Sequence, residues 1–514
     1  MFVDARTLDD NSTLTADLAI VGAGPAGITV ARAFAGRNLR VALIESGALE
    51  ATAETQALYE GESVGIDYPL AATRLRYFGG SSNHWGGFCR PLDVIDFEAR
   101  DWVPHSGWPF GRDELMLYYA TADGLVEVAP ANYEDSTYWQ RKTGKALLQL
   151  ATGRMVLGFV HYGPPTHFGT RYQDELVGAG NIQILLNANV VNIAAGPNAR
   201  TVTHLDVRTL TGKKHRVRAQ QFVLATGGLE NPRLLLLSND VMPMGLGNQH
   251  DLVGRFFMEH PHLPGFGEIV MVDEKRLPQI FRENIPADGH YVNAAFKPTA
   301  EFMRRERLLN ATLQVGVAGH YRRQDSVPHP DADKAAAHAD MLRAARPFLV
   351  EAGAPAGETA EQRLGVWLGL GCACEQVPNP DSRVTLADTR DALGLRRIRL
   401  DWRLTEQDRR SVVRHMRSLA LEFGALGIGR MLVDIEDDGQ WPEQVIGGSH
   451  HMGTTRMHDD PKQGVVDRNC KVHDIDNLYV AGSSVFPTCG TANPTLTLVA
   501  LAVRLAEHLQ EKFR

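Results

Sequence analysis

The chain has 514 residues, of which 44% are hydrophobic and 22% charged, a composition typical of soluble globular proteins and not of disordered, collagen-like or disulfide-stapled ones. Its net charge of −8 provides no basic field for nucleic acid or an anionic membrane, so neither is expected as a partner.

The five cysteines are an odd number without paired CxxC blocks, which favours a reducing compartment. The first residues are acidic where a signal peptide would be basic and then apolar, and the longest apolar run, 364–374, is too short to cross a bilayer. We therefore expect a cytoplasmic protein, and the sequence leaves its oligomeric state open.

The first predicted elements form a strand, turn, helix and strand. Leu18–Val21 is apolar, the turn GAGPAG follows at 22–27, and Ile28–Phe34 has apolar residues at helical spacing. Val41–Ile44 is a second apolar strand that ends at Glu45. This order predicts a βαβ unit.

Three glycines and one acid in this unit are typical of dinucleotide binding. Gly22 would allow the turn, Gly24 the approach of a pyrophosphate, and Gly27 the close packing of helix on strand. Glu45 would bind ribose hydroxyls and disfavours the 2′-phosphate of NADP. The alternative is a glycine-rich turn without a ligand.

Later apolar segments predict strands at 182–186, 189–193, 204–209 and 221–225. The last of them is followed by a Gly227-Gly228 turn and a leucine-rich helix at 234–237, and an amphipathic helix at Thr495–Phe513 ends the chain. These segments extend the sheet that begins with the βαβ unit.

Between these parts the pattern changes. Candidate strands lie at 267–272, 311–318 and 396–402, and the Ala/Asp/Glu-rich stretch 322–363 predicts one or two exposed helices with solvated His329 and His338. We expect a discontinuous dinucleotide-binding domain at 14–261 and 445–514. A substrate-binding domain is expected at 262–444, with part of 100–175 contributing to it.

Three further segments combine glycines with polar and aromatic residues. They are RYFGGSSNHWGG at 76–87, GGSHHMGTTRM at 447–457, and NLYVAGSSVFPTCGTANPT at 477–495. Such loops let backbone pass close to a flat ligand while polar side chains address its edge.

In this order, with ATGGLENPR at 225–233, the segments resemble the glucose-methanol-choline (GMC) flavoprotein oxidoreductases, in particular their branch related to pyranose oxidase. The resemblance implies an α/β fold with a Rossmann-like FAD-binding domain and an inserted α+β domain on an antiparallel sheet. It also implies FAD as cofactor, oxidation of an alcohol group of a sugar, glycoside or polyol, and oxygen or another electron acceptor.

The resemblance assigns the catalytic pair to His450, as base, and Asn493, which would hold the hydroxyl. Two alternatives remain open. His451 could carry out the chemistry while His450 has a structural role, and Asn493 before Pro494 could be a helix N-cap.

Further cofactor contacts are expected in the glycine-rich loop and on the later strands, at Gly80, Ser81, Ser82, Asn83, His84, Val190, Ala225, Gly482, Asn493 and Thr495. For His84 the resemblance leaves open a covalent 8α-histidyl link to FAD or a non-covalent contact. Substrate contacts are placed at Gln314, Gln376 and His451, because uncharged hydrogen-bonding side chains suit sugars. No metal is expected at His260-Pro261-His262 or at His450-His451.

Two other functions fit the same residues. One is an alcohol oxidoreductase of a biosynthetic pathway that acts on an aminoglycoside or cyclitol. The other, from a different class, is a lyase that keeps FAD as a structural element. Reduction of the flavin by substrate would separate the lyase from both oxidoreductases.

Overall fold

The strand, turn, helix and strand at the start of the chain form as predicted. In the computed structural model, β3 (Leu18–Val21) and β4 (Val41–Ile44) are parallel neighbours joined through α1 (Pro25–Ala33). The backbone at Gly22 has φ +100°, and a Cβ on Gly27 would lie 1.9 Å from the Gly22 carbonyl oxygen. The two glycines thus permit a sharp turn with the helix close to the strand.

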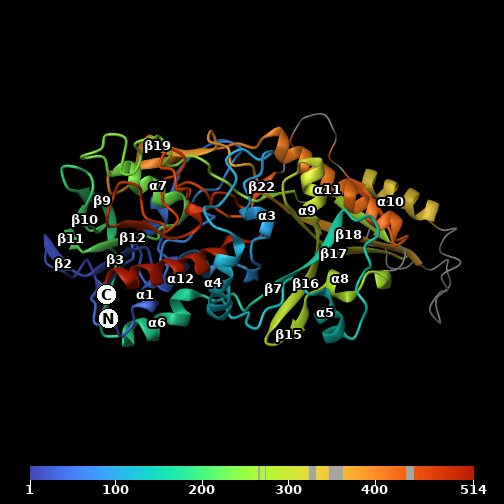
Figure 1. Cartoon of the computed structure of the whole chain (residues 1–514), viewed down its shortest axis with the longest axis horizontal. Helices are drawn as coiled ribbons and strands as arrows, with labels where there is room; N and C mark the ends of the chain where they lie inside the picture. The colour runs from blue at the N-terminus through green and yellow to red at the C-terminus, as the bar shows by residue number, and fades with distance from the viewer. Residues whose placement is uncertain are drawn as a thin grey trace.

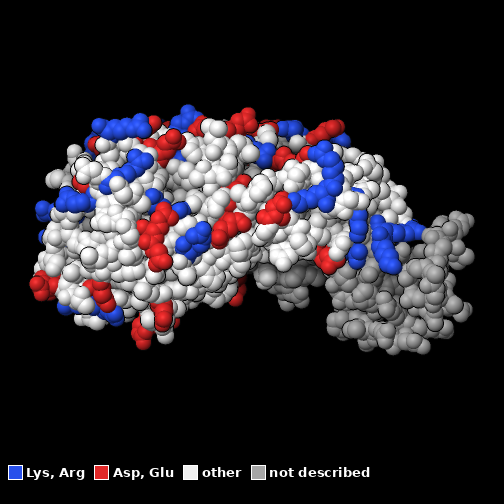
Figure 2. Space-filling model, turned by 90° about the horizontal axis from the view of Figure 1, so that it is seen from below, with Lys and Arg blue, Asp and Glu red and all other residues white. Residues whose placement is uncertain are grey.

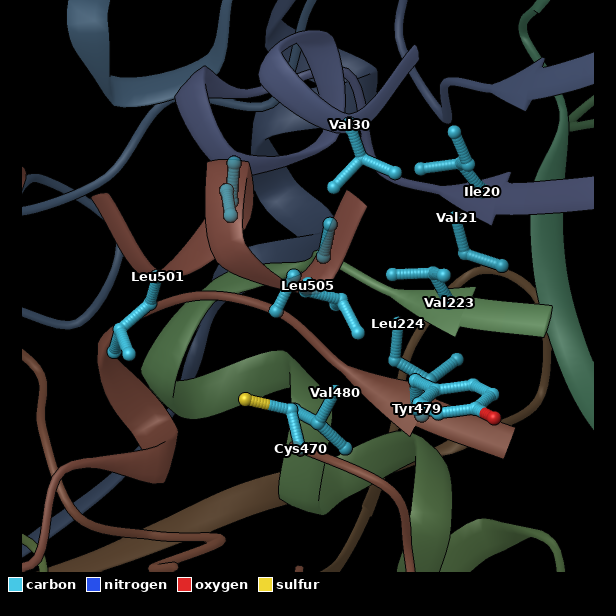
Figure 3. Packing of buried hydrophobic residues seen from close by; sticks show 14 of the residues in the cluster. Ile20, Val21, Val30, Val223, Leu224, Cys470, Tyr479, Val480, Leu501 and Leu505 are labelled. Carbon is cyan, nitrogen blue, oxygen red and sulfur yellow. The ribbon is translucent and has the colours of Figure 1, made fainter. Parts of the chain in front are cut away.

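This unit belongs to a six-stranded, wholly parallel sheet of order β1-β8-β4-β3-β12-β23. The added strands are β1 (Phe2–Asp4), β8 (Ile182–Leu186), β12 (Gln221–Leu224) and β23 (Leu478–Val480). Figure 3 shows side chains of β3, β12 and β23 packing with Leu501 and Leu505 of the last helix, α12 (Pro494–Lys512). The two ends of the chain therefore share one hydrophobic core.

Helices cover this sheet, and two small sheets flank it. α12 packs on α1 and α4 (Arg112–Leu125), and α6 (Phe168–Gly178) packs on α1. One small sheet has the order β2-β11-β10-β9, formed by Ser12–Thr15, Lys214–Arg218, Val202–Arg208 and Asn189–Ala195. The other has the order β19-β20-β5, formed by Arg383–Arg390, Arg396–Trp402 and Gly61–Gly65.

A ten-stranded sheet forms the other end of the elongated molecule (Figure 1). Its main path is β21 (Arg430–Val433), β14 (Gly267–Met271), β18 (Arg363–Cys374), β17 (Ala311–Arg322), β16 (His290–Pro298), β7 (Met155–Tyr162) and β6 (Phe88–Cys89). The short strands β13 (Pro261–His262), β15 (Ile285–Ala287) and β22 (Ile446–Gly447) pair beside it. β6, β7 and β22 thus join this sheet from outside the predicted segment 262–444, whose boundaries stay a prediction.

One face of this sheet packs against helices. Phe281 of α8 (Gln279–Arg282) and Phe423 of α11 (Glu406–Ala425) both contact Phe296 of β16. Side chains alternate along a strand, so Leu313 of β17 enters this core while Gln314 points to the opposite face. Further helices of more than one turn within the described residues are α5 (Ser136–Thr143), α7 (Gly227–Leu237), α9 (Ala300–Glu306) and α10 (Ala332–Ala345).

Short helical segments connect the larger elements. The one-turn helices α2 and α3 are Ala53–Gln56 and Val94–Phe97, and the described residues include 3-10 helices at Ala57–Tyr59, Gly80–Asn83, Glu274–Arg276 and Ser483–Val485. The structure describes residues 1–263, 267–271, 274–322, 332–345, 363–433, 435, 441 and 445–514. Within these ranges, no helix is both long and apolar enough to span a membrane.

The start of α7 differs from the sequence prediction. The expected turn at Gly227-Gly228 is the start of α7 (Gly227–Leu237), which includes Pro232. Pro232 has no N–H for the Gly228 carbonyl, and the Thr454 hydroxyl donates to that carbonyl instead. A residue from the far end of the chain therefore stabilises a helix that local sequence rules would end.

The prediction of a solvated His338 is wrong. Its ring lies fully buried on α10, 3.0 Å from the Glu268 carboxylate of β14. His329 lies outside the described residues.

Figure 2 shows Lys and Arg mixed with Asp and Glu over the face seen from below. All five cysteines are buried and unpaired.

Candidate active site

A cavity of about 580 Å³ is lined by residues of both the parallel and the ten-stranded sheet. Most of the side chains and glycines that the sequence singled out line it: Gly22, Gly24, Glu45, Gly80, Ser81, Ser82, His84, Val190, Ala225, Gln314, His450, His451, Gly482, Asn493 and Thr495. Segments that are hundreds of residues apart in the sequence thus meet around one space.

One part of the cavity has the features of a dinucleotide cradle. Gly24 precedes α1 in an extended conformation, and no atom lies within 4 Å of the position that its Cβ would take. No side chain caps α1, so the backbone N–H groups of its first turn have no capping side-chain oxygen, and Gly24, Pro25 and Ala26 at this helix start line the cavity. An anionic diphosphate fits this place, because helix N-termini attract negative charge and donate hydrogen bonds.

Glu45 is held at the edge of this cradle by the backbone. Its two carboxylate oxygens accept hydrogen bonds from Ala23 N, at 3.0 Å, from Gly47 N, at 2.8 Å, and from the Ser46 hydroxyl, at 3.2 Å. A carboxylate has about four acceptor positions, so these three bonds leave one position for a ribose hydroxyl. The residues present therefore fit the adenosine and diphosphate portion of FAD.

A buried ion network lines the same cavity and has no counterpart in the sequence prediction. Glu230 of α7 pairs with Arg74 at 2.8 Å, Arg233 at 3.1 Å and Arg76 at 3.3 Å, and Arg233 also pairs with Asp391 at 2.7 Å. Burial raises the pKa of Glu230, but the arginines outweigh it and bring the pKa to about 2. Glu230 thus stays ionised and ties α7 to the segment before the glycine-rich loop.

His450 and Asn493 meet in the cavity. The Asn493 Nδ2 lies 3.1 Å from the His450 Nε2. Asn493 occupies the N-cap position of α12, with Pro494 at the first helical position, yet its side chain makes no capping hydrogen bond. The amide is therefore used for the histidine contact and not for capping.

The neighbouring His451 has a different environment. Its Nε2 lies 3.2 Å from the Thr73 hydroxyl, and its ring packs against Tyr68 and Phe257. It lines the cavity as well, but no hydrogen bond to Asn493 is found for it among the described residues. Of the two adjacent histidines, His450 is the one paired with the amide.

Burial keeps both rings neutral. It lowers the pKa of His450 well below its ordinary value, and the nearby His260, His262 and His451 lower it further. Burial and the charge of Arg74 lower the pKa of His451 to about 3. A neutral imidazole can accept a proton, so His450 has the protonation state that a base requires.

Glu259 and His260 support His450, and sequence analysis missed this role. The His260 Nδ1 lies 3.0 Å from the His450 Nδ1, and the Glu259 carboxylate accepts hydrogen bonds from the backbone N–H of His450 and of Gly448. The signal in the sequence for this role is the His-Pro-His motif at 260–262, which by itself suggests metal ligands and not a contact with His450.

His84 lies at the surface end of the glycine-rich loop. It lines the cavity and is exposed, directly after the 3-10 helix Gly80–Asn83. Within the part of the chain that the structure describes, its ring has no hydrogen bond. The position therefore leaves the ring available to a ligand in the cavity.

Three predicted residues lie outside the cavity lining. Gly27 packs under the turn, and the Asn83 amide donates to the Phe78 carbonyl at 3.0 Å. Gln376 is fully buried, where its amide oxygen accepts from Glu259 N and Trp402 Nε1 and its NH₂ donates to the Phe257 and Arg403 carbonyls. With its amide saturated in this way, Gln376 has no group left for a substrate.

Gln314 remains a candidate for substrate contact. Its NH₂ donates to the Tyr162 hydroxyl at 2.7 Å and to the Asn293 amide oxygen at 3.3 Å, and both partners lie on neighbouring strands of the same sheet. Since Tyr162 accepts from Gln314, its own hydroxyl hydrogen is available to another acceptor.

Two family models match the chain. The model described as FAD dependent oxidoreductase matches residues 17–370, and that described as GMC oxidoreductase matches residues 378–502. Together they extend over the parallel sheet, the ten-stranded sheet and the segment that carries His450 and Asn493.

The chain is also similar to individual proteins of known activity or structure. The large subunit of fructose dehydrogenase from Gluconobacter japonicus is 24% identical over 97% of this chain and 98% of its own. Pyranose 2-oxidase from Tricholoma matsutake is 33% identical over 25% of this chain and 22% of its own. The crystal structure of pyridoxine 4-oxidase from Mesorbium loti has the same fold, with a TM-score of 0.58 and 22% identity over 96% of this chain and 99% of that one.

Proposed function

Because the chain belongs to the FAD-dependent oxidoreductases, and within them to the GMC oxidoreductases, we propose that it oxidises an alcohol group of a sugar, glycoside or polyol with His450 as base. The observation that carries the proposal is the 3.1 Å contact between the His450 Nε2 and the Asn493 Nδ2 inside the cavity. A substrate hydroxyl that replaces this contact would accept a hydrogen bond from the Asn493 NH₂ and donate one to the His450 Nε2.

His450 and Asn493 have different roles in this reaction. The His450 Nε2 takes the hydroxyl proton, and the Asn493 NH₂ donates to the same oxygen and keeps it in place. When bound, FAD supplies the ring that accepts a hydride from the alcohol carbon.

The substrate class is supported by the cavity lining and by the relatives. Gln314 lines the cavity and donates to Tyr162 and Asn293 of the ten-stranded sheet, and an uncharged hydrogen-bonding side chain of this kind suits a hydroxyl better than a charged group does. The two curated relatives described above are named for sugars, fructose and pyranose.

A substrate screen tests the proposal. Purified holoprotein is mixed with sugars, glycosides, polyols, an aminoglycoside and a cyclitol, with an artificial electron acceptor, with and without oxygen. We expect acceptor reduction with at least one sugar, glycoside or polyol, and oxygen consumption without the acceptor would identify an oxidase. Turnover of the aminoglycoside or cyclitol alone would replace the substrate class, and product formed with neither acceptor reduction nor oxygen consumption would indicate a lyase.

The exposed His84 allows a separate prediction about FAD attachment. If an 8α-histidyl link exists, acid precipitation leaves yellow colour in the pellet, and His84→Ala releases all FAD to the supernatant while the folded variant still binds it. The cradle at Gly24 and Glu45 explains that retention, because it holds the other end of the cofactor. A colourless wild-type pellet leaves His84 as a non-covalent contact.

A further inference from the structure

We propose that His260 is a positioning residue that fixes which nitrogen of His450 carries the proton. The inference rests on the proposed role of His450 as base. The pairing of two short strands brings the two histidines together: β13 and β22 are antiparallel, with Pro261 opposite Gly447 and His262 opposite Ile446. His260 directly precedes β13 and His450 follows β22 by three residues, between this pairing and the antiparallel bridge of Met258 with Met452.

The hydrogen positions follow from the far side of His260. Its Nε2 lies 3.4 Å from the Cys489 carbonyl oxygen, which can only accept a hydrogen bond. The Nε2 of His260 therefore carries the hydrogen. His260 is fully buried, and burial together with the charge of His262 lowers its pKa to about 3, so the ring is neutral and its Nδ1 is bare.

The unprotonated Nδ1 of His260 determines the tautomer of His450. The two Nδ1 atoms are 3.0 Å apart, so the His450 Nδ1 must carry the hydrogen that joins them. Neutral His450 then has a bare Nε2, which accepts from the Asn493 Nδ2. The other tautomer would place two bare nitrogens against each other and two donors between His450 and Asn493.

The same arrangement supports the proton after transfer. Once the His450 Nε2 has taken a proton from the alcohol, the ring is positive, and its Nδ1–H still donates to the lone pair of His260. A charged donor makes a stronger hydrogen bond than a neutral one, so this contact favours the state that forms during the reaction.

Glu259 keeps the two strands in place. Its buried carboxylate accepts from the backbone N–H of His260, Gly448 and His450, and from the Tyr68 hydroxyl. Burial raises the pKa of Glu259 to about 7, and these four hydrogen bonds oppose the rise. Among the described residues, the other titratable groups that act on the pair are His262 and His451.

The test compares two substitutions at one position. His260→Asn presents an amide oxygen near the place of the Nδ1, whereas His260→Leu has no acceptor. We expect His260→Leu to lower the limiting rate of flavin reduction by roughly tenfold to a hundredfold with KM little changed, and His260→Asn to restore most of it. His215→Leu is the control, because His215 is also buried and bonded to a carbonyl, that of Ala5, outside the cavity.

Three results would overturn the inference: a wild-type rate in His260→Leu, equal rates in the Leu and Asn variants, or equal losses in His260→Leu and His215→Leu. If the Leu variant does not fold, nitrogen-15 NMR of labelled histidines in the wild-type protein decides, with the His450 signals identified by their absence in His450→Ala. A protonated Nδ1 supports the inference, and a protonated Nε2 contradicts it. Full activity of His450→Ala would instead refute the proposed function.

Discussion

Replacing His450 with alanine should leave FAD bound and slow its reduction by substrate by roughly 10²–10⁴-fold, the usual contribution of a general base. The imidazole is neutral and contacts Asn493, and under the proposed function its removal leaves the alcohol proton without an acceptor. Rapid mixing under anaerobic conditions measures the rate directly.

The adjacent histidine provides the matched comparison. His451 is equally buried but bonded to Thr73, so we expect His451→Ala to impair the reduction rate less than His450→Ala. Asn493→Ala should lie between them, with a loss of roughly tenfold to a hundredfold for one hydrogen bond to a developing charge. If His451→Ala abolishes flavin reduction and His450→Ala does not, the base is His451 and not His450.

Replacing Gly24 with valine should give a folded but colourless protein. The backbone at Gly24, with φ −84° and ψ −173°, is allowed to any residue, and the new side chain would meet no protein atom within 4 Å of its Cβ. It would instead fill the space where the cofactor's diphosphate meets the start of α1. Absorbance of the purified protein and its melting temperature without FAD measure the two effects separately.

Gly111→Val is the control for this substitution. Gly111 also precedes a helix, α4, in an extended conformation with open space around its Cβ, but it does not line the large cavity. We expect this variant to stay yellow. A yellow Gly24→Val protein with normal FAD content would contradict the assignment of the FAD diphosphate to the start of α1.

The local patterns of the sequence predicted the strands and the turn well. β3, β4, β8, β12 and β20 lie where apolar runs predicted them, because buried parallel strands and short amphipathic strands have strong hydrophobic signals. The glycine pattern at 22–27 likewise has a local cause, the sharp turn at Gly22.

What the sequence could not predict depends on contacts between distant segments. β13 and β22 have two residues each, too short for any periodicity, yet their pairing brings His260 to His450 across 190 positions. α7 continues through Pro232, and the hydroxyl of the distant Thr454 donates to the Gly228 carbonyl that the proline leaves without an N–H. Gln376 looked suited to a sugar, but the fold surrounds its amide with four partners.

The most direct test of the central claim is one anaerobic mixing experiment. Wild-type holoprotein is mixed with the alcohol that the screen identifies, and the flavin absorbance and the carbonyl product are followed together. The proposed function predicts that the yellow colour bleaches at the rate of product formation, with one product per flavin. Product formed while the flavin stays oxidised would contradict it, because FAD would then have no redox role in the reaction.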